Sequence, residues 1–181
     1  MREIPEIHRD AVARYSQEAR ERAGAHGAFD SEIRALGMTP RSETEVDRIS
    51  PPPEIARALG VAEGEPSVIV RRRRMYANDV PVQLADSYIP AGIAEGTQLA
   101  EVDSGSGGII SRFAELGYAQ VRITERVRSR RATDEEQAFL RLEDDQAVIE
   151  VWHIGWTADD RPVAIAMPAY LWVLDYAWPT S

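Results

Sequence analysis

Two stretches of the sequence place the same types of element in the same order. Residues 50–90 and residues 133–172 each contain a helix-like segment, a polar gap, a strand-like segment, a turn rich in Asn or Asp, a Pro-Val dipeptide and a second strand-like segment. Pro81-Val82 in the first stretch corresponds to Pro162-Val163 in the second. Repeated units of this kind bury their apolar faces against one another. The sequence therefore predicts one α+β domain, a mostly antiparallel sheet with flanking helices on one face, made of two pseudo-symmetric helix–hairpin halves.

Turn and cap signals place the individual elements. Residues 40–50 alternate like a strand, and a short helix follows, with Ser50 as its candidate cap and Gly60 at its end. Residues 67–88 form the first predicted hairpin, about the turn ANDVP. The other expected elements are a charged helix over residues 8–23 followed by a hinge, a glycine loop and helix ending at Gly117, a strand over 120–131, a helix with the capping box Thr133–Glu136, and a hairpin over 147–176.

Length and composition limit the class of protein. The 181 residues, 44% of them hydrophobic, suffice for one domain with an N-terminal extension. We expect residues 1–30 to be that helix and hinge and residues 31–181 to be the domain. No apolar run approaches the roughly 20 residues of a membrane span, and the N-terminus is too charged for a signal peptide. The chain has no cysteine, which excludes disulfides and agrees with a cytoplasmic location.

Four consecutive arginines, Arg71–Arg74, stand out in a chain of net charge -9. On a strand, successive side chains face opposite sides of the sheet, so at most two of the four share a face. Binding of nucleic acid needs a wider basic surface, which an acidic chain does not offer. Two interpretations remain. The run is a solvated edge, or one pair, Arg71 with Arg73 or Arg72 with Arg74, faces a ligand that carries a carboxylate or phosphate.

Two further features are candidates for ligand contacts. The sequence GSGG at residues 105–108 opens a helix, whose N-terminal N–H groups attract anionic or carbonyl oxygens. Glycine is equally the usual residue of a tight turn, and both interpretations stay open. His153 is either a partly buried strand histidine or a hydrogen-bonding partner of a ligand. It has no Cys, Asp or Glu at metal-ligand spacing, so neither a metal nor a cofactor is expected.

The motifs VRRRRMYANDVPVQLADSYIP, SGSGGIISRFAELGY, ITERVRSRRATDEEQAFLRL and WTADDRPVAIAMPAYLWVLDY follow one another within residues 40–178. This series resembles the UTRA domain, the effector-binding domain of HutC-type regulators in the GntR superfamily. Residues 13–37 resemble the linker that precedes it in actinobacterial members. The resemblance implies a chorismate lyase-like fold, a small-molecule effector and a homodimer. It also implies operator DNA binding through an N-terminal winged helix-turn-helix domain, which is missing before residue 8.

The resemblance also points to site residues. In sugar-phosphate-sensing members, arginines before the first hairpin turn hold the anion, and Arg73 occupies one such position. Glu125 matches the family's glutamate. Other family positions carry different residues here: Met75, Ala85, Gly108, Ile110 and Ala164. These departures imply a less anionic and more apolar effector, or one held mainly by Arg71 or Arg73 between aromatic walls. The predicted ligand-binding residues are Arg71, Arg73, Gln83, Ser87, Ser106, Gly107, Gly108, Ile109, Glu125, His153 and Tyr170.

An enzyme is the alternative to a sensor. Chorismate lyase shares the implied fold, and its chemistry needs arginines and a glutamate around a dicarboxylate, which Arg71–Arg74 and Glu125 could supply. The sequence shows no nucleophile with a base and an orienting partner, so no catalytic residue is assigned. A regulator returns its ligand unchanged, whereas a lyase or cyclase turns it over. We expect the effector to order the loops around residues 91–108 and to reposition residues 8–30.

Overall fold

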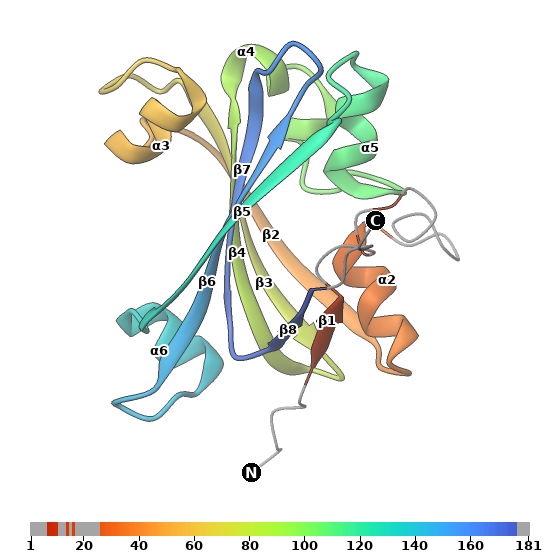
Figure 1. The fold of residues 1–181 in the computed structure, drawn as a ribbon, viewed down its shortest axis with the longest axis vertical. Helices are drawn as coiled ribbons and strands as arrows, with labels where there is room; N and C mark the ends of the chain where they lie inside the picture. The colour runs from red at the N-terminus through yellow and green to blue at the C-terminus, as the bar shows by residue number, and fades with distance from the viewer. Residues whose placement is uncertain (1–6, 11–13, 15, 17–25, 177–181) are drawn as a thin grey trace, which may run out of the picture.

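The computed structural model describes residues 7–10, 14, 16 and 26–176. Its centre is a six-stranded antiparallel sheet in the order β2-β3-β4-β7-β6-β5 (Figure 1), which confirms the predicted α+β fold. The first half of the sheet and its helix are β2 (Pro40–Ile49), α3 (Pro53–Leu59), β3 (Val68–Ala77) and β4 (Val80–Pro90). The second half is β5 (Arg122–Arg131), α6 (Asp134–Leu140), β6 (Ala147–Trp156) and β7 (Pro162–Tyr170).

The repeat is longer than the sequence analysis predicted. An eight-residue helix precedes each half: α2 (Ala28–Ala35), which starts within the expected hinge and continues where no element was predicted, and α5 (Gly108–Glu115). Both begin after a glycine N-cap and end at a leucine followed by a glycine with positive φ, Gly37 in one case and Gly117 in the other. Each repeat is therefore helix, strand, helix, strand, strand.

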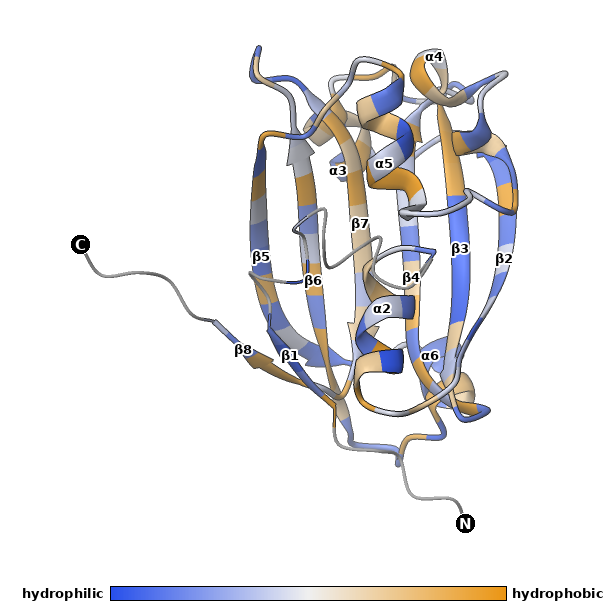
Figure 2. Cartoon of the chain, turned by 90° about the vertical axis from the view of Figure 1, so that its right-hand side faces the viewer, coloured by the Kyte–Doolittle hydropathy of each residue, from blue (hydrophilic) through white to orange (hydrophobic). Residues whose placement is uncertain are grey.

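Helices cover both faces of the sheet, which corrects the expectation of a single covered face. α3 and α6 lie on one face, and α2 and α5 lie on the other (Figure 1). Figure 2 shows α2 and α5 stacked in front of the central strands. Ile33 and Phe113, at matching positions of α2 and α5, are fully buried. The space between these two helices and the sheet is the region in which the candidate site lies.

The helices α3 and α6 each pack on the other half of the molecule. Ile55 and Leu59 of α3 share a hydrophobic cluster with Ile165 of β7. In the same way Leu140 of α6 shares a cluster with Leu84 of β4. Full burial of a side chain of this size stabilises the fold by about 1.5–3 kcal/mol. The two halves are thus held together by reciprocal exchange of their helices.

The chain ends form a second, two-stranded sheet. β1 (His8–Asp10) pairs in parallel with β8 (Val173–Asp175). Residues 8–10 are therefore strand and not helix, and most of the predicted helix over 8–23 lies outside the described residues. The second hairpin ends at Tyr170, because the chain then turns to pair with β1. The pairing fixes the N-terminal segment beside the main sheet.

Most predicted turns and caps are confirmed. Asn78 and Asp79 both have positive φ, 49° and 61°, as a two-residue hairpin turn requires. Thr133 and Glu136 form the capping box of α6. Ser50 does not cap α3, because Pro52 takes the N-cap position, although Gly60 closes the helix as expected. Between the halves, where a loop was expected, lie α4 (Ala91–Ala94) and the 3-10 helix η3 (Gln98–Ala100). No helix within the described ranges is long and apolar enough to cross a membrane.

Candidate functional site

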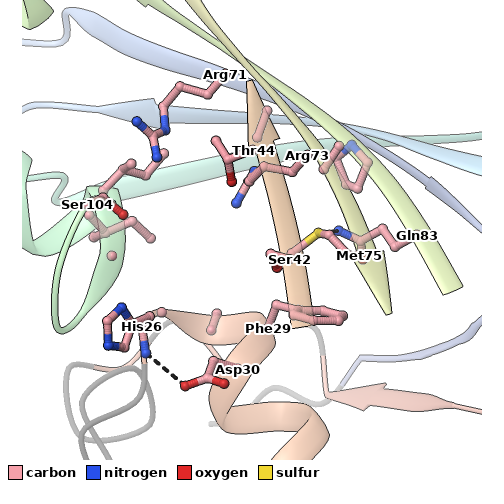
Figure 3. Close-up of a pocket in the computed structure, with 18 of the residues that line it drawn as sticks. His26, Phe29, Asp30, Ser42, Thr44, Arg71, Arg73, Met75, Gln83 and Ser104 are labelled. Carbon is pink, nitrogen blue, oxygen red and sulfur yellow. Dashed lines mark hydrogen bonds between the residues drawn. The ribbon is translucent and has the colours of Figure 1, made fainter. Parts of the chain in front are cut away.

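A cavity of about 430 Å³ lies between the sheet and the N-terminal ends of α2 and α5 (Figure 3). This volume is typical of sites for small metabolites. Residues from both halves form its floor: Ser42, Thr44, Arg71, Arg73, Met75, Gln83, Ala85, His153, Gly155, Ala164, Ala166 and Pro168. Its walls are residues 26–30, 102–104 and 107–110, and Arg9 and Arg14 approach from the N-terminal segment.

The arginine run divides between the two faces of the sheet, as alternation along a strand requires. Arg71 and Arg73 line the cavity. Arg72 and Arg74 face the opposite side, where they pair with Asp47 and Glu135 respectively. Of the two pairs that the sequence left open, the first therefore faces the candidate site.

Arg71 has a structural task in this cavity. Its side chain is buried, and its guanidinium donates to the carbonyl oxygens of Leu99 and Val102, both at 3.0 Å, and of Glu101. Burial lowers the pKa of Arg71, and the carboxylates of Asp103 and Glu101 oppose that shift. Because its donors are directed at backbone carbonyls, Arg71 holds the segment 99–102 over one end of the cavity.

Arg73 is the arginine of the run best placed to contact a ligand. Its guanidinium extends into the cavity, with Thr44 and Ser42 beside it (Figure 3). Its Nη2 donates to Ser87 Oγ at 2.8 Å, and Ser87 is fully buried in β4. The hydroxyl helps to orient the guanidinium. A carboxylate or phosphate would meet a planar cation already aligned for two parallel hydrogen bonds.

The glycine loop brings two helix N-termini together. Gly107 and Gly108 both have positive φ, 77° and 67°. A Cβ on Gly108 would lie 3.1 Å from the carbonyl oxygen of His26 and 3.2 Å from Cα of Gly27, the N-cap of α2. The tight-turn interpretation accounts for glycine at this position, because Gly108 has positive φ and a Cβ there would lie closer to backbone than ordinary van der Waals contact. The first turns of both helices also line the cavity, and helix N-termini carry partial positive charge.

His153, which is buried, and Glu125, which is half-buried, form a pair on the second half of the sheet. His153 Nδ1 lies 3.0 Å from Glu125 Oε1, and Tyr176 donates its hydroxyl to Glu125 Oε2 at 3.0 Å. Burial lowers the pKa of His153, and Glu125 opposes this shift only partly, so the neutral imidazole is favoured. The cross-strand pair Glu125–His153 occupies the place that Thr44–Arg73 holds in the first half. The cavity thus has a cationic group on one side and an imidazole on the other.

The predicted site residues are largely brought together. Those that line the cavity are Arg71, Arg73, Gln83, Gly107, Gly108, Ile109 and His153. Three others lie just behind it, each in contact with a lining side chain: Ser87 with Arg73, Glu125 with His153, and Tyr170 with Arg9. Ser106 is not part of the lining, and its carbonyl accepts a hydrogen bond from Arg112 at 3.4 Å.

The positions that depart from the sugar-phosphate pattern also line the cavity. Met75, Ala85, Ile110 and Ala164 give it an apolar section next to Ala166 and Pro168 of β7. No group of three or more His, Cys, Asp or Glu side chains in the described part of the chain is arranged to hold a metal ion.

Several lining residues escaped the sequence analysis. Ser42 and Thr44 of β2 could have been found, because alternation along the predicted strand puts them on one face. Phe29 and Asp30 could have been found only by matching α2 to α5. Arg9 carried no signal, because nothing in its neighbourhood indicates that β1 pairs with a strand 165 residues later.

The family of the chain follows from comparison with known sequences. A sequence profile of the UTRA domain matches residues 35–170, well over half of the chain. The chain belongs to the UTRA family. This UTRA domain is 26% identical over 138 residues to the HTH-type transcriptional regulator Rv0792c of Mycobacterium tuberculosis. The alignment covers 74% of this chain and 49% of that protein, so the domain spans about half the length of this relative.

Solved structures agree with the family assignment. The ligand-binding domain of a GntR-family transcriptional regulator from Bordetella bronchiseptica is 30% identical, with a TM-score of 0.63 over 73% of this chain and 84% of that one. PhnF from Mycobacterium smegmatis has a TM-score of 0.77 at 15% identity, over 98% of this chain and 74% of that one, and shows likeness of fold alone. This UTRA domain is an effector-binding domain of the GntR regulator type, and family membership decides against the enzyme alternative.

Proposed function

We propose that this UTRA domain binds a small anionic effector in the cavity and controls operator binding by a winged-helix domain of the same regulator. The observation that carries the proposal is the charge of the cavity. The chain has a net charge of -9, yet six arginines line the cavity against two aspartates: Arg9, Arg14, Arg34, Arg41, Arg71 and Arg73, with Asp30 and Asp103. A concave site of one sign attracts ligands of the other sign.

Arg73 is the proposed anchor for the anionic group. Arg34 is paired with Asp30 and Arg41 with Asp79, so their charges are largely balanced at the rim. Arg71 is engaged with carbonyl oxygens. Arg73 points into the cavity, and the hydroxyl of Ser87 helps to orient its guanidinium. A carboxylate or phosphate bound there forms charge-assisted hydrogen bonds in a half-buried setting, where they are stronger than in water.

The rest of the lining indicates what kind of molecule carries the anion. Met75, Ala85 and Ala164 offer methyl and thioether groups where sugar hydroxyls would need polar partners. Phe29, at the start of α2, adds an aromatic wall. We therefore infer an organic acid or phosphate ester with a compact apolar body, in preference to a sugar phosphate.

Dimerisation and coupling complete the proposal. Residues 1–30 connect the ligand-binding domain, residues 31–181, to the DNA-binding domain, and the regulator acts in the cytoplasm as a homodimer. The edge strand β5 supports pairing with a second copy, because Val121 beside it and Val127 within it are 65% and 43% exposed. Operators with two half-sites require such two-fold symmetry.

The test is a pair of neighbouring arginine variants. A panel of small carboxylic acids and phosphate esters is screened by thermal shift, and the best ligand is measured by calorimetry on wild type, R73Q and R72Q. We expect R73Q to bind about tenfold more weakly or worse, as for loss of a hydrogen bond between charged groups. R72Q loses the same charge on the opposite face and should bind within about twofold of wild type. Equal binding by all three proteins would remove Arg73 from the site.

Recovery of the ligand separates a sensor from an enzyme. After prolonged incubation the ligand is analysed by mass spectrometry. A sensor returns it chemically unchanged, and any product that depends on the protein contradicts the regulator function.

A further inference from the structure

Gly155 of β6 lines the cavity at a position where the backbone does not require glycine. Its φ lies outside the left-handed region that favours this residue. Because His153 corresponds to Arg73, Gly155 corresponds to Met75 in the first half. The register of the sheet shifts directly after both Met75 and Gly155. Methionine is compatible with this irregularity, so the bulge alone does not explain the glycine.

The amide group of Gln120 fills the space above Gly155. A Cβ on Gly155 would overlap the carbon, oxygen and nitrogen atoms of that amide, so the glycine makes room for it. Gln120 comes two residues before β5, and the N–H of Val121 donates to the carbonyl oxygen of Trp156 at 2.9 Å. This backbone bond keeps Gln120 beside β6. The amide is therefore held at the floor of the cavity, which both Gln120 and Gly155 line.

The Gln120 amide contains a buried acceptor that the domain does not satisfy. Its Oε1 exposes less than 1 Å² to solvent and accepts no hydrogen bond within the described part of the chain. Turning the amide by half a turn exchanges Oε1 and Nε2 and leaves one of them in the same buried place. Buried polar groups without a partner destabilise a fold and are rare. The position of this amide therefore has no explanation in the stability of the domain.

Gln83 provides a contrast within the same cavity. Its Oε1 accepts a hydrogen bond from Arg9 at 3.0 Å, and its Nε2 donates to the sulfur of Met75 at 3.1 Å. Both ends of the Gln83 amide are thus bonded to protein, and the residue is buried. Gln83 has a structural role in the wall, which makes it a matched control for Gln120.

We propose that Gln120 is a specificity-determining residue of the effector site, where its amide recognises a hydroxyl, amine or carboxamide group of the effector. This inference rests on the proposed function, because it takes the cavity to be the effector site. A rotation of the Gln120 side chain turns its buried oxygen toward a donor in the cavity. The effector then supplies the partner that the domain lacks.

The sheet sets the spacing between this contact and the proposed anion anchor. Arg73 lies on β3 and Gly155 on β6, with β4 and β7 between them. At about 4.8 Å from strand to strand, β3 and β6 are about 14 Å apart. One ligand reaches both side chains only if its polar groups lie at opposite ends of its body. The inferred effector is therefore a carboxylic acid or phosphate ester with a second hydrogen-bonding group at its far end.

Matched pairs of acids test this recognition. The probes are hexanoate with its terminal hydroxyl and carboxamide derivatives, and benzoate with its para-hydroxyl and para-carboxamide derivatives. Each is titrated by calorimetry into wild type, Q120L, G155A and R73Q. We expect at least one polar derivative to bind wild type about tenfold more tightly than its plain acid. Q120L should lose this preference while its affinity for the plain acid stays within about twofold of wild type.

G155A tests the space above β6 without changing the amide itself. The added methyl group displaces the end of a flexible side chain and strains no backbone, so the domain should fold normally. We expect G155A to lose the preference as Q120L does. The double variant should bind the polar acid no more weakly than either single variant, because both changes remove the same contact. Additive losses would show that the alanine obstructs the ligand directly, and would overturn the role given to Gly155.

Stability provides a readout that needs no ligand. Q120L keeps the approximate size of the side chain and removes an unsatisfied acceptor, so its Tm should equal or exceed that of wild type. Q83L removes an amide with two bonded ends, and its Tm should fall by roughly 2–4 °C or more. If Q120L loses as much as Q83L, the Gln120 amide is a structural partner and the inference fails.

The outcomes separate this inference from the proposed function. If no polar derivative binds wild type more tightly than its plain acid, or if the preference survives in Q120L, the inference fails. The proposed function stands in both cases when the acids lose affinity in R73Q. If wild type binds none of the probes, the inference fails as well, and the effector screen alone then decides the proposed function.

Discussion

Arg71 and Arg73 are identical side chains two residues apart on one face of β3, and the structure gives them different tasks. We predict that replacing Arg71 by Met lowers the stability of the fold, whereas replacing Arg73 by Met lowers ligand affinity. Methionine keeps most of the length and apolar surface of each arginine, so the comparison isolates the guanidinium. The two variants also remove the same charge.

The expected costs follow from the hydrogen bonds that each variant loses. In R71M three carbonyl oxygens lose their donor, and that of Leu99 is buried, which alone costs about 1–3 kcal/mol. The other two carbonyls, of Glu101 and Val102, are part-buried and open to water, and add about 0.5–1 kcal/mol each. R71M no longer buries a charged guanidinium, which offsets part of this cost. The net loss of unfolding free energy is about 3 kcal/mol. R73M loses the bond to the Ser87 hydroxyl, which contributes about 1 kcal/mol.

Urea unfolding followed by tryptophan fluorescence measures both free energies of unfolding. In thermal unfolding of a domain of this size, these losses correspond to a Tm lower by roughly 6–12 °C for R71M and by roughly 2–4 °C for R73M. Hydrogen exchange adds a local test, since R71M should release amides in residues 98–103 while those of the sheet stay protected. Equal destabilisation by the two variants, or unchanged protection of residues 98–103 in R71M, would refute the roles assigned here.

Three other substitutions test separate parts of the structure. G108A should destabilise the fold by clearly more than the roughly 1 kcal/mol expected for G117A in urea, because both glycines have positive φ but only Gly108 abuts backbone. Burial lowers the pKa of His153 in the folded state below its unfolded value of about 6.5. The stability that this shift contributes is present above about pH 6.5 and is lost as the pH falls through the folded-state pKa. H153Q should therefore show a smaller loss of Tm between about pH 7.5 and 5.5 than wild type. R130M removes the ion-pair partner of Glu136 and one of the two arginines that contact Glu150, and should cost about 3 kcal/mol in urea unfolding.

Each of these expectations has a result that contradicts it. Equal losses of unfolding free energy in G108A and G117A would show that the backbone at Gly27 shifts to accommodate the added Cβ at little cost. Parallel pH profiles for wild type and H153Q would mean that His153 does not take up its proton in this range. R128M is the control for R130M, because Arg128 also contacts Glu150 but is half exposed; similar costs for both would rule out a special role for the buried ion pair.

Local sequence patterns predicted most of the sheet. The alternation of β2 and β5, the two Pro-Val hairpins and the capping box of α6 each give a signal within about ten residues, where backbone preference and burial agree. Alternation also restricted the arginine run to two candidate pairs. It could not rank Arg71 against Arg73, because that difference depends on segment 99–102 folding back over one of them.

Long-range contacts explain the errors. Residues 8–10 lie in a stretch rich in Arg, Glu and Ala, whose propensity favours a helix, yet pairing with β8 makes them a strand. α2 was missed for another reason. Its segment GAFDSEIRALG matches GGIISRFAELG at a spacing of 80 residues, glycine to glycine, and the comparison of the two halves began too late in the sequence to include it.

The reciprocal packing of α3 on β7 and α6 on β4 gives this chain the organisation of two domain-swapped protomers joined into one. Either half alone would leave the apolar face of its last strand bare, and only a second half brings the helix that covers it. Two identical halves would enclose a cleft with equivalent ends. Here the ends differ, with Arg73 on one side and His153 on the other. The unequal halves therefore allow an asymmetric molecule to bind in a single orientation.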